Sequence, residues 1–489
     1  MKCAKRMLPL LLLAFTLLLS ACSSADGEDS YQEPEENVLI YAALNPVTYD
    51  LERAINRFNM DHEDIQIEVR DYSDEGGIQR LFVELIAGHI PDIMELQRIS
   101  YVTGSRGDVF ERLWYGRKLE SNHRYLGNIA SYSKEDYWLP YRRMVQLGYF
   151  EDLWPYIEND PAFGRERVLE APLKAAEVDG GLYMLFKEFS VDTLMGSERI
   201  VGNRHGWTLD ELMETFASMP EGSTILEYDA VQRDVFFSLL SNTLDQFIDW
   251  ETGQCSFDSK GFRDMLRFLD QFPSEFETNL SEELLDEEIG MRQLKGLQML
   301  EPTNVGMARD IMSRNAFFGE HASFVGYPTA DGSFGSSFIL HGNKVAMSAT
   351  CQNKDAAWEF MRVWIRNSGR GIPAMLEAEN MEEIRIPVNR KDYDIMNRCM
   401  LVEAEEHDYF FPYVPYEGGP KVKRGPFVKA DIEQLDDLIN ATTQIYWPDS
   451  NLADIVWESI GPYLVGDKSM DDTVALVQGR VSLYVNEQR

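Results

Sequence analysis

The chain contains little cysteine and none of the longer motifs that mark common enzymes. Beyond the first 22 residues only Cys255, Cys351 and Cys399 remain, and no pair of them has C-x-x-C spacing. Such an odd, small set argues against a disulfide scaffold and is typical of buried free thiols. The motifs of zinc proteases, serine hydrolases, P-loop proteins and dinucleotide-binding domains are missing, and the seven histidines are scattered without metal-ligand spacing.

Two short patterns that could suggest catalysis carry little weight. Residues 131–134 fit S-x-x-K, but the companion motifs of that enzyme class are absent. Glu287 and Glu288 form an acidic pair, yet a chain with 82 acidic residues contains such pairs by chance. We therefore predict that the protein is not an enzyme and uses neither a cofactor nor a metal.

Positive charge is also scarce. Lys and Arg number 46 against 82 Asp and Glu, which gives a net charge of −36. Binding to a phosphate backbone depends on clustered Lys and Arg, so nucleic acid is excluded as a partner. A chain of 489 residues that is 44% hydrophobic can bury a large core, and its length predicts more than one domain.

The first residues have the features of an export signal. Basic residues precede an apolar run at 8–19, which is too short to span a membrane as a mature helix. The run ends in Leu-Ser-Ala-Cys, which resembles a bacterial lipobox and implies acylation of Cys22 after removal of residues 1–21. Residues 22–37 are polar and acidic, which predicts a flexible tether.

From residue 38 the pattern is βαβαβ. Continuous or alternating apolar runs predict strands, and apolar residues at helical spacing predict the helices between them; the strands are 38–42, 65–69 and 92–96, and the helices cover 51–58 and 78–86. Right-handed crossovers make such a sheet parallel, so its ligand chemistry is expected at the carboxyl ends of the strands.

The second half mixes helices with short strands. Thr208 and Glu211 have the spacing of a capping box, and the Trp before them is expected to pack as a hydrophobic staple. We predict a helix over 235–244, two short strands about a Gly turn near residue 253, and a strand at 297–300. Regular apolar faces near the carboxyl terminus predict further helices.

Residues 323–364 contain the most specific sequence motifs of the chain. An apolar run stops at Pro328, Asp331-Gly332 supplies a turn, and a second run leads into a helix. The segments VGYPTADGS and NKDAAWEF here, GHIPDIMEL at 88–96 and GWTLDEL at 206–212 resemble the extracellular solute-binding proteins of family 1, the sugar-type receptors of bacterial ABC importers.

The resemblance implies an α/β fold, a two-lobed clamp of the periplasmic-binding-protein type. Each lobe would be a mixed, mostly parallel sheet flanked by helices, and the second lobe would be rich in helix. Lobe 1 would comprise residues 38–188 plus 337–395, and lobe 2 residues 189–336 plus 396–489. Residues 99–147 depart from the family pattern and form either a flap near the cleft or a surface insertion.

The resemblance also implies a function and a location. The protein would capture a sugar or oligosaccharide and deliver it to the permease of an ABC importer. It would be a monomer held on the extracytoplasmic face of the cell membrane by its lipid anchor alone. Two alternatives remain open: a ligand sensor for a signalling receptor, and a surface hydrolase of polysaccharides.

A sugar site needs flat apolar faces for the ring and planar polar groups for the hydroxyls. The sequence offers both kinds of group near the expected cleft, after strands, at the second lobe crossing and in an aromatic loop at 405–426. The candidate ligand-binding residues are Asn45, Gln97, Glu301, Tyr327, Phe411 and Tyr413.

The lipobox yields a direct test. In cells, Cys22→Ser should move the protein from the membrane to the soluble fraction, because the acylated thiol is lost. Ser23→Ala, one residue further on, is the control that leaves the thiol in place. Immunoblots of fractionated cells measure the distribution, and unchanged membrane association of Cys22→Ser would contradict the anchor.

Overall fold

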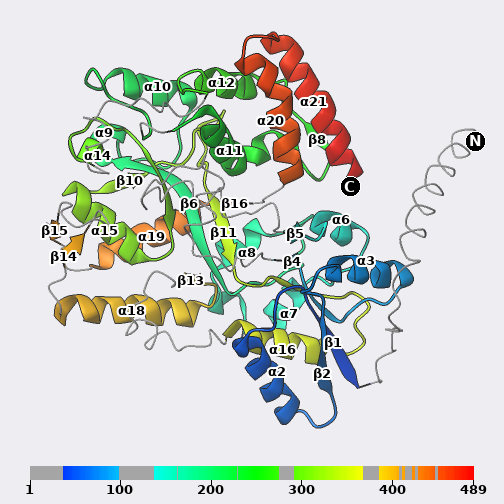
Figure 1. The fold of residues 1–489 in the computed structure, drawn as a ribbon. Coiled ribbons are helices and arrows are strands. Elements are labelled where there is room, and N and C mark those ends of the chain that lie inside the picture. Colours follow the sequence, from blue (N-terminus) through cyan, green and yellow to red (C-terminus); the bar gives the residue numbers. More distant parts are fainter. Residues whose placement is uncertain are drawn as a thin grey trace, which may run out of the picture. The chain divides into compact units, whose positions relative to one another are not determined.

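The structure is a computed structural model that carries side chains. It describes residues 37–98, 137–161, 163–227, 230–274, 291–366, 385–406, 410–412, 421–423, 428–446 and 450–488. Figure 1 labels the elements.

A four-stranded sheet forms from the first part of the chain and one later strand. Its order is β12-β3-β1-β2, with β1 parallel to β3 and β12 antiparallel to β3. The predicted βαβαβ pattern is confirmed, and Gly88 ends α3 in the left-handed conformation, with φ of 87°. The elements are β1 (Val38–Ala43), α2 (Tyr49–Asp61), β2 (Gln66–Asp71), α3 (Gly77–Ala87), β3 (Ile93–Glu95), β12 (Val345–Met347) and α16 (Lys354–Arg366).

A second sheet is built around one long strand, β6 (Glu188–Ser197). Both β9 and β10 pair with Met195, and both β11 and β13 pair with Phe189, so each of these pairs occupies opposite edges of β6. All four partners are antiparallel to β6, and β16 extends the sheet parallel to β11. The partners are β9 (Glu301–Val305), β10 (Ala322–Phe324), β11 (Ser337–His341), β13 (Ile386–Pro387) and β16 (Gln444–Ile445).

The segments expected to cross between lobes are therefore paired with each other. The lobe boundaries expected from the sequence fall at 188/189 and 336/337, so β6 and β11 lie at the two expected crossings. In the structure Asp192 lies opposite Ser337, and the antiparallel register runs on to Glu188 opposite His341. The two segments form one continuous backbone ladder.

One predicted strand is wrong in position. The sequence predicted a strand at 297–300, ending before Glu301, but β9 begins at Glu301 and runs to Val305. Pro302 lies inside it, opposite Leu194 of β6. Because β9 pairs with β6 alone in the described part of the chain, it is an edge strand, where a residue without an N–H is tolerated.

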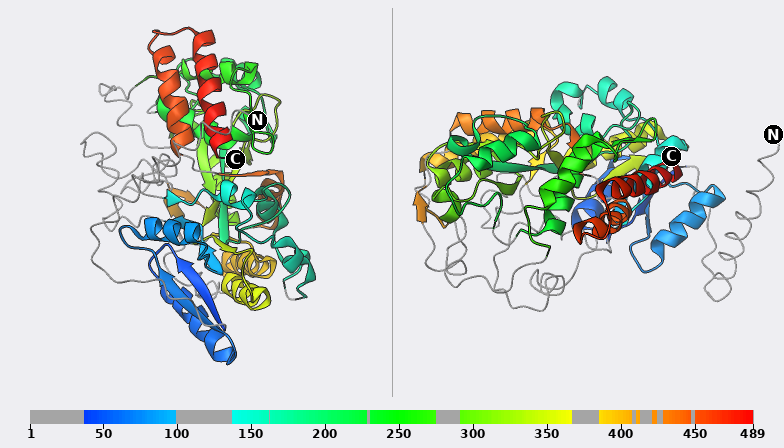
Figure 2. Two further views of the ribbon diagram at one scale, coloured as in Figure 1. Left: turned by 90° about the vertical axis from the view of Figure 1, so that its right-hand side faces the viewer. Right: turned by 90° about the horizontal axis from the view of Figure 1, so that it is seen from above.

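Helices make up most of the remaining described chain. The predicted helix near 235–244 and the short hairpin about Gly253 are both present, as α11 and as β7 with β8. Helices α20 and α21 lie side by side in Figures 1 and 2. The elements are α6 (Tyr141–Gln146), α7 (Trp154–Asn159), α8 (Glu170–Ala175), α9 (Glu198–Val201), α10 (Leu209–Ala217), α11 (Gln232–Thr243), α12 (Lys260–Leu269), α14 (Met291–Leu294), α15 (Ala308–Phe318), α18 (Arg390–Glu406), α19 (Lys429–Ala441), α20 (Ser450–Leu464) and α21 (Met470–Glu487).

Short strands and 3₁₀ turns complete the fold. Two of the short strands, β14 and β15, pair inside the segment expected to be an aromatic loop. They are β4 (Gln97–Arg98) with β5 (Tyr137–Trp138), β7 (Ile248–Asp249) with β8 (Gln254–Cys255), and β14 (Phe410–Pro412) with β15 (Lys421–Lys423); the 3₁₀ turns are η2 (Arg165–Arg167) and η3 (Leu244–Gln246).

The described residues contain two hydrophobic core clusters of buried side chains. The first core cluster packs the four-stranded sheet with α2, α16 and the segment around Trp154. The second core cluster packs α11, α12, α20 and α21 around Phe262 and Val477. Strand β6 contributes to both, with Val191 in the first and Leu194 in the second.

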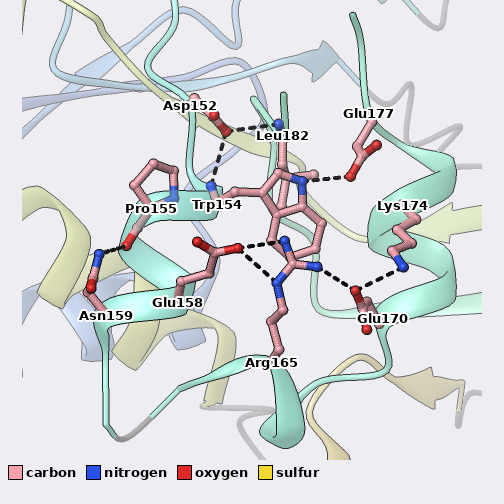
Figure 3. A network of polar contacts seen from close by, with 10 residues as sticks. All are labelled: Asp152, Trp154, Pro155, Glu158, Asn159, Arg165, Glu170, Lys174, Glu177 and Leu182. Atoms are coloured by element: carbon pink, nitrogen blue, oxygen red, sulfur yellow. Dashed lines mark hydrogen bonds and ion pairs between the residues drawn. The ribbon is translucent and has the colours of Figure 1, made fainter. Parts of the chain in front are cut away.

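Arg165 is the centre of a network of polar contacts at the surface of the first core cluster, as Figure 3 shows. Its guanidinium lies 4.1 Å from the ring centre of Trp154 and bonds Glu158 at 2.7 Å and Glu170 at 2.5 Å. The Trp154 indole N–H donates to Glu177 at 2.7 Å. These charges are paired with one another, so we assign them to stability and not to a site.

In the described ranges no helix is both long and apolar enough to cross a bilayer.

The predicted capping box at the start of α10 is confirmed. The Thr208 hydroxyl accepts from the Glu211 N–H at 3.2 Å, and the Glu211 carboxylate accepts from the Thr208 N–H at 2.7 Å. Trp207, the residue before the cap, is buried and its indole N–H donates to the Gly326 carbonyl oxygen at 2.9 Å.

Removing this cap should cost stability. Thr208→Ala leaves the Glu211 N–H without its acceptor and should lower the free energy of unfolding by about 1 kcal/mol. Thr208→Ser keeps the hydroxyl and should stay close to the wild type. Urea unfolding followed by circular dichroism measures both, and equal midpoints for the Ala and Ser variants would contradict the role of the cap.

Candidate functional site

Two of the predicted ligand residues, Asn45 and Gln97, meet at the carboxyl ends of β1 and β3. The Asn45 amide nitrogen donates to Glu95 Oε2 and to the Gln97 carbonyl oxygen, both at 2.8 Å. The Gln97 side chain accepts from Lys344 Nζ at 2.6 Å. All four side chains are at least 97% buried.

Glu95 is the centre of this arrangement, which we call the Glu95 network (Tyr41, Asn45, Glu95, Gln97, Lys344). Its carboxylate accepts from the Tyr41 hydroxyl at 2.9 Å and from the backbone N–H groups of Leu44 and Asn45 at 2.9 and 3.0 Å. Burial raises the pKa of Glu95, and the bonds from Asn45 and Tyr41 oppose that rise. With its donors and acceptors so extensively paired, the network fastens β1, β3 and the start of β12 together.

The other predicted residues lie apart from that network. Glu301 is 1% exposed in β9 and forms an ion pair with Arg314 of α15 at 3.0 Å. Phe411 lies in β14 with its backbone opposite Val422. Tyr413 lies outside the described residues. A ligand role for Asn45, Gln97, Glu301, Phe411 and Tyr413 stays a prediction.

A second polar group lies across the sheet of β6. Asp192 is paired with Asn304 on one side and Ser337 on the other. Directly opposite residues in antiparallel strands project from the same face, so these three side chains form a polar row on that face. Ser337 is in turn the partner of Gln444 in β16, which extends the row to the sheet edge.

One face of α11 covers this row. Ser238, Ser241 and Asn242 are spaced three and four residues apart, so they share a face of the helix. Asn242 donates to Asp192 Oδ2 at 2.8 Å. The hydroxyl of Tyr327 lies near Ser238 and that of Tyr446 lies near Ser241, and both tyrosines lie close enough to Asp192 for its charge to raise their pKa.

We call this group the Asp192 cluster (Asp192, Asn242, Asn304, Tyr327, Tyr446). It contains one predicted residue, Tyr327, whose ring is 3% exposed. Its backbone N–H donates to the Gly335 carbonyl oxygen at 2.6 Å. A Cβ at position 335 would come within 2.2 Å of the Tyr327 carbonyl oxygen, so only Gly allows the chain to pass this close.

The Asp192 cluster differs from the Glu95 network in one respect: two of its buried polar atoms have no partner. Among the described residues, nothing hydrogen-bonds to Asn242 Oδ1 or to Asn304 Nδ2. Asn242 is itself fully buried. An unpaired buried amide atom costs free energy, so this acceptor and this donor make the Asp192 cluster a candidate site.

Burial also sets the charge of the cluster. It raises the pKa of Asp192 to about 7, against the opposing bond from Asn242. Burial raises the pKa of Tyr446 to about 12, and that of Tyr327 also rises for the same reason. At neutral pH both phenols remain donors and the carboxyl group is partly protonated, so the cluster is suited to hydroxyl groups of an uncharged ligand.

Local sequence pattern does not predict the Asp192 cluster. Asp192, Asn242 and Asn304 lie in three separate segments of mixed polarity, and nothing in their spacing relates them. The one sequence signal is the carboxylate of Asp192 within the segment that forms β6. Carboxylates are rarely buried unless they are paired, so a buried Asp is unusual. In the described ranges, no three His, Cys, Asp or Glu side chains are grouped so that they could hold a metal ion.

Comparison with known proteins identifies the fold. No protein-family model and no curated protein matches the chain. A periplasmic oligogalacturonide binding protein from Yersinia enterocolitica superposes with a TM-score of 0.51 at 13% identity, covering 92% of this chain and 99% of that one. A de novo designed esterase superposes with a TM-score of 0.50 at 13% identity, covering 93% and 100%.

The predicted fold class is confirmed by this likeness. The chain has an α/β, two-lobed fold of the periplasmic-binding-protein type, and the alignments cover nearly all of it. The two larger sheets are both mixed, and in the sheet of β6 the antiparallel pairs predominate.

The raised pKa of Asp192 makes stability depend on pH. The folded pKa of about 7 lies above the usual value of 3.8, so between these values the folded state holds a proton that the unfolded state has lost. The contribution of Asp192 to the free energy of unfolding is therefore full below pH 3.8 and is lost as the pH rises through 7.

Asp192→Asn removes this titration and can still accept from Asn242. Relative to the wild type, the variant should gain on the order of 4 kcal/mol between pH 4 and pH 8, because one pKa unit is worth about 1.4 kcal/mol. Asp258→Asn, on an exposed position, controls for the loss of one negative charge. Urea unfolding across pH measures the difference, and a constant offset would contradict the burial of an ionisable Asp192.

Proposed function

We propose that this chain is an extracytoplasmic carbohydrate-binding protein that captures a sugar or oligosaccharide and delivers it to an ABC importer. The observation that carries the proposal is the Asp192 cluster, where a buried amide oxygen and a buried amide nitrogen lack partners beside two tyrosines. The fold supports it, since the Yersinia protein with the same fold is described as binding oligogalacturonides.

The chemistry of the cluster suits a ligand with many hydroxyl groups. A hydroxyl both donates and accepts, so one can donate to Asn242 Oδ1 while another accepts from Asn304 Nδ2. The tyrosines supply two further polar tips on apolar rings, the combination that a sugar needs. Asp192 completes the set as a strong acceptor when charged.

Capture would proceed by closure of the clamp. We assign lobe 1 to residues 38–188 plus 337–395 and lobe 2 to residues 189–336 plus 396–489, with β6 and β11 at the crossings. The ligand would favour the closed arrangement by binding it more tightly than the open one. Gln97, Glu301 and the other predicted residues would act at the edge of the cleft or support its walls.

Delivery requires the protein to stay near the permease. The lipobox at Cys22 and the acidic segment 22–37 would hold a monomer at the outer face of the membrane on a tether, and the lipid would be its sole attachment. Effective concentration near the permease is then set by the length of that tether.

Calorimetric titration against a panel of neutral and acidic oligosaccharides tests the proposal. The wild type should bind a member of the panel, and Asn304→Ala should bind it about five- to tenfold more weakly, because a hydrogen bond is worth about 1 kcal/mol. Asn486→Ala, on α21, is the matched control and should bind like the wild type.

Thermal unfolding of each variant separates binding from folding. No heat with any carbohydrate, or equal weakening by Asn304→Ala and Asn486→Ala, would contradict the proposed site. Consumption of the ligand during a long incubation would instead favour the hydrolase.

A further inference from the structure

Helix α6 makes contacts with both core clusters. Its apolar side belongs to the first core cluster, where Tyr141, Met144 and Val145 are buried. The Tyr141 ring stacks on Phe150 with their centres 6.0 Å apart, and Phe150 is in turn bridged to Ser348 just after β12. The helix is therefore fixed to the first core cluster by packing on one side.

Helix α6 also carries two consecutive arginines, and both of them contact segments that pack in the second core cluster. The Arg142 guanidinium lies 4.9 Å from the ring centre of Trp250, in the turn between β7 and β8. Arg143 donates to the backbone carbonyl oxygen of Glu487, at the end of α21. Trp250 and α21 both pack in the second core cluster.

The surroundings of Arg142 favour a specific contact over a chance one. Its guanidinium is withdrawn from water, which lowers its pKa, while the carboxylates of Asp245 and Asp179 and the Tyr141 hydroxyl oppose that change. Asp245 lies in η3, next to Leu244 of the second core cluster, and Asp179 follows Val178 of the first core cluster. Carboxylates beside both core clusters therefore act on one arginine. Arginine stacked on tryptophan away from water is the strongest form of a cation–π contact.

We propose that Arg142 and Trp250 form a latch that holds the two core clusters together in the absence of ligand. This rests on the two-lobed clamp of the proposed function but not on the identity of its ligand. The latch would raise the population of the closed arrangement in the absence of ligand, and the ligand would favour the same arrangement further. Arg143 would add to it, since a cation beside the last carbonyls of a helix is favourable.

The test uses the full mature chain without any carbohydrate. Arg142→Met keeps the aliphatic stem and removes the guanidinium, and Trp250→Leu removes the ring. Each should shift the closed-to-open ratio about tenfold toward the open state, seen as a larger radius of gyration in small-angle scattering. The double variant should shift it no further than either single variant, because both remove the same contact.

Arg57→Met is the matched control. Arg57 is exposed on α2, a helix that packs in the first core cluster, and its ion pair with Asp61 lies within the same helix. It should leave the radius of gyration unchanged. Arg142→Lys, which keeps the charge but not the planar stack, should lie between the wild type and Arg142→Met.

The latch is overturned if Arg142→Met and Trp250→Leu unfold cooperatively and scatter like the wild type. It is equally overturned if Arg57→Met expands the particle as much, or if the effects of the two latch variants add. Because no carbohydrate is present, a chain that binds none would sink the proposed function and leave this result standing. Conversely, a chain that binds sugar with no change in the latch variants would sink the latch alone.

Discussion

The fold depends on the backbone pairing of β6. This strand has ten residues, and its hydrogen-bonding edges are shared by β9, β10, β11 and β13, segments that span residues 301–387 of the sequence. Its side chains enter both core clusters. Backbone groups buried at this depth must be paired, so the ladder fixes the register of everything attached to it. The alignment of Asp192 with Asn304 and Ser337 is a direct consequence.

Two buried polar centres differ in how the cost of burying a carboxyl group is met. In the Glu95 network an acidic group is surrounded by donors, and the cost of burying it is offset by at least four hydrogen bonds. In the Asp192 cluster the carboxyl group receives one described side-chain bond, from Asn242, and its pKa rises toward neutrality. The two centres therefore differ in how far their buried polar atoms are paired within the described chain.

The expected site residues illustrate the limits of reasoning from strand ends. Asn45 and Gln97 do converge, because the carboxyl ends of parallel neighbours meet at one edge. They converge on Glu95 and Lys344, and local pattern could not reveal that partners 50 and 247 residues away would occupy their polar atoms. Glu301 shows a different limit. Its strand contains Pro302, and the edge position of β9 is what makes a residue without an N–H acceptable there.

The sequence by itself determined the elements whose cause is local: the βαβαβ start, the capping box at Thr208, the hairpin about Gly253 and the helices α11 and α21. Each depends on residue spacing or on turn chemistry within a few residues. The motifs that resemble the solute-binding family then predicted the two-lobed fold. Only the tertiary structure decided that β6 would pair with four other strands, that Asp192, Asn242 and Asn304 would share one buried cluster, and that Arg142 would lie on Trp250. These contacts join residues 50 to more than 100 positions apart. Their partners are selected by register and burial across the whole fold, which no local stretch of sequence records.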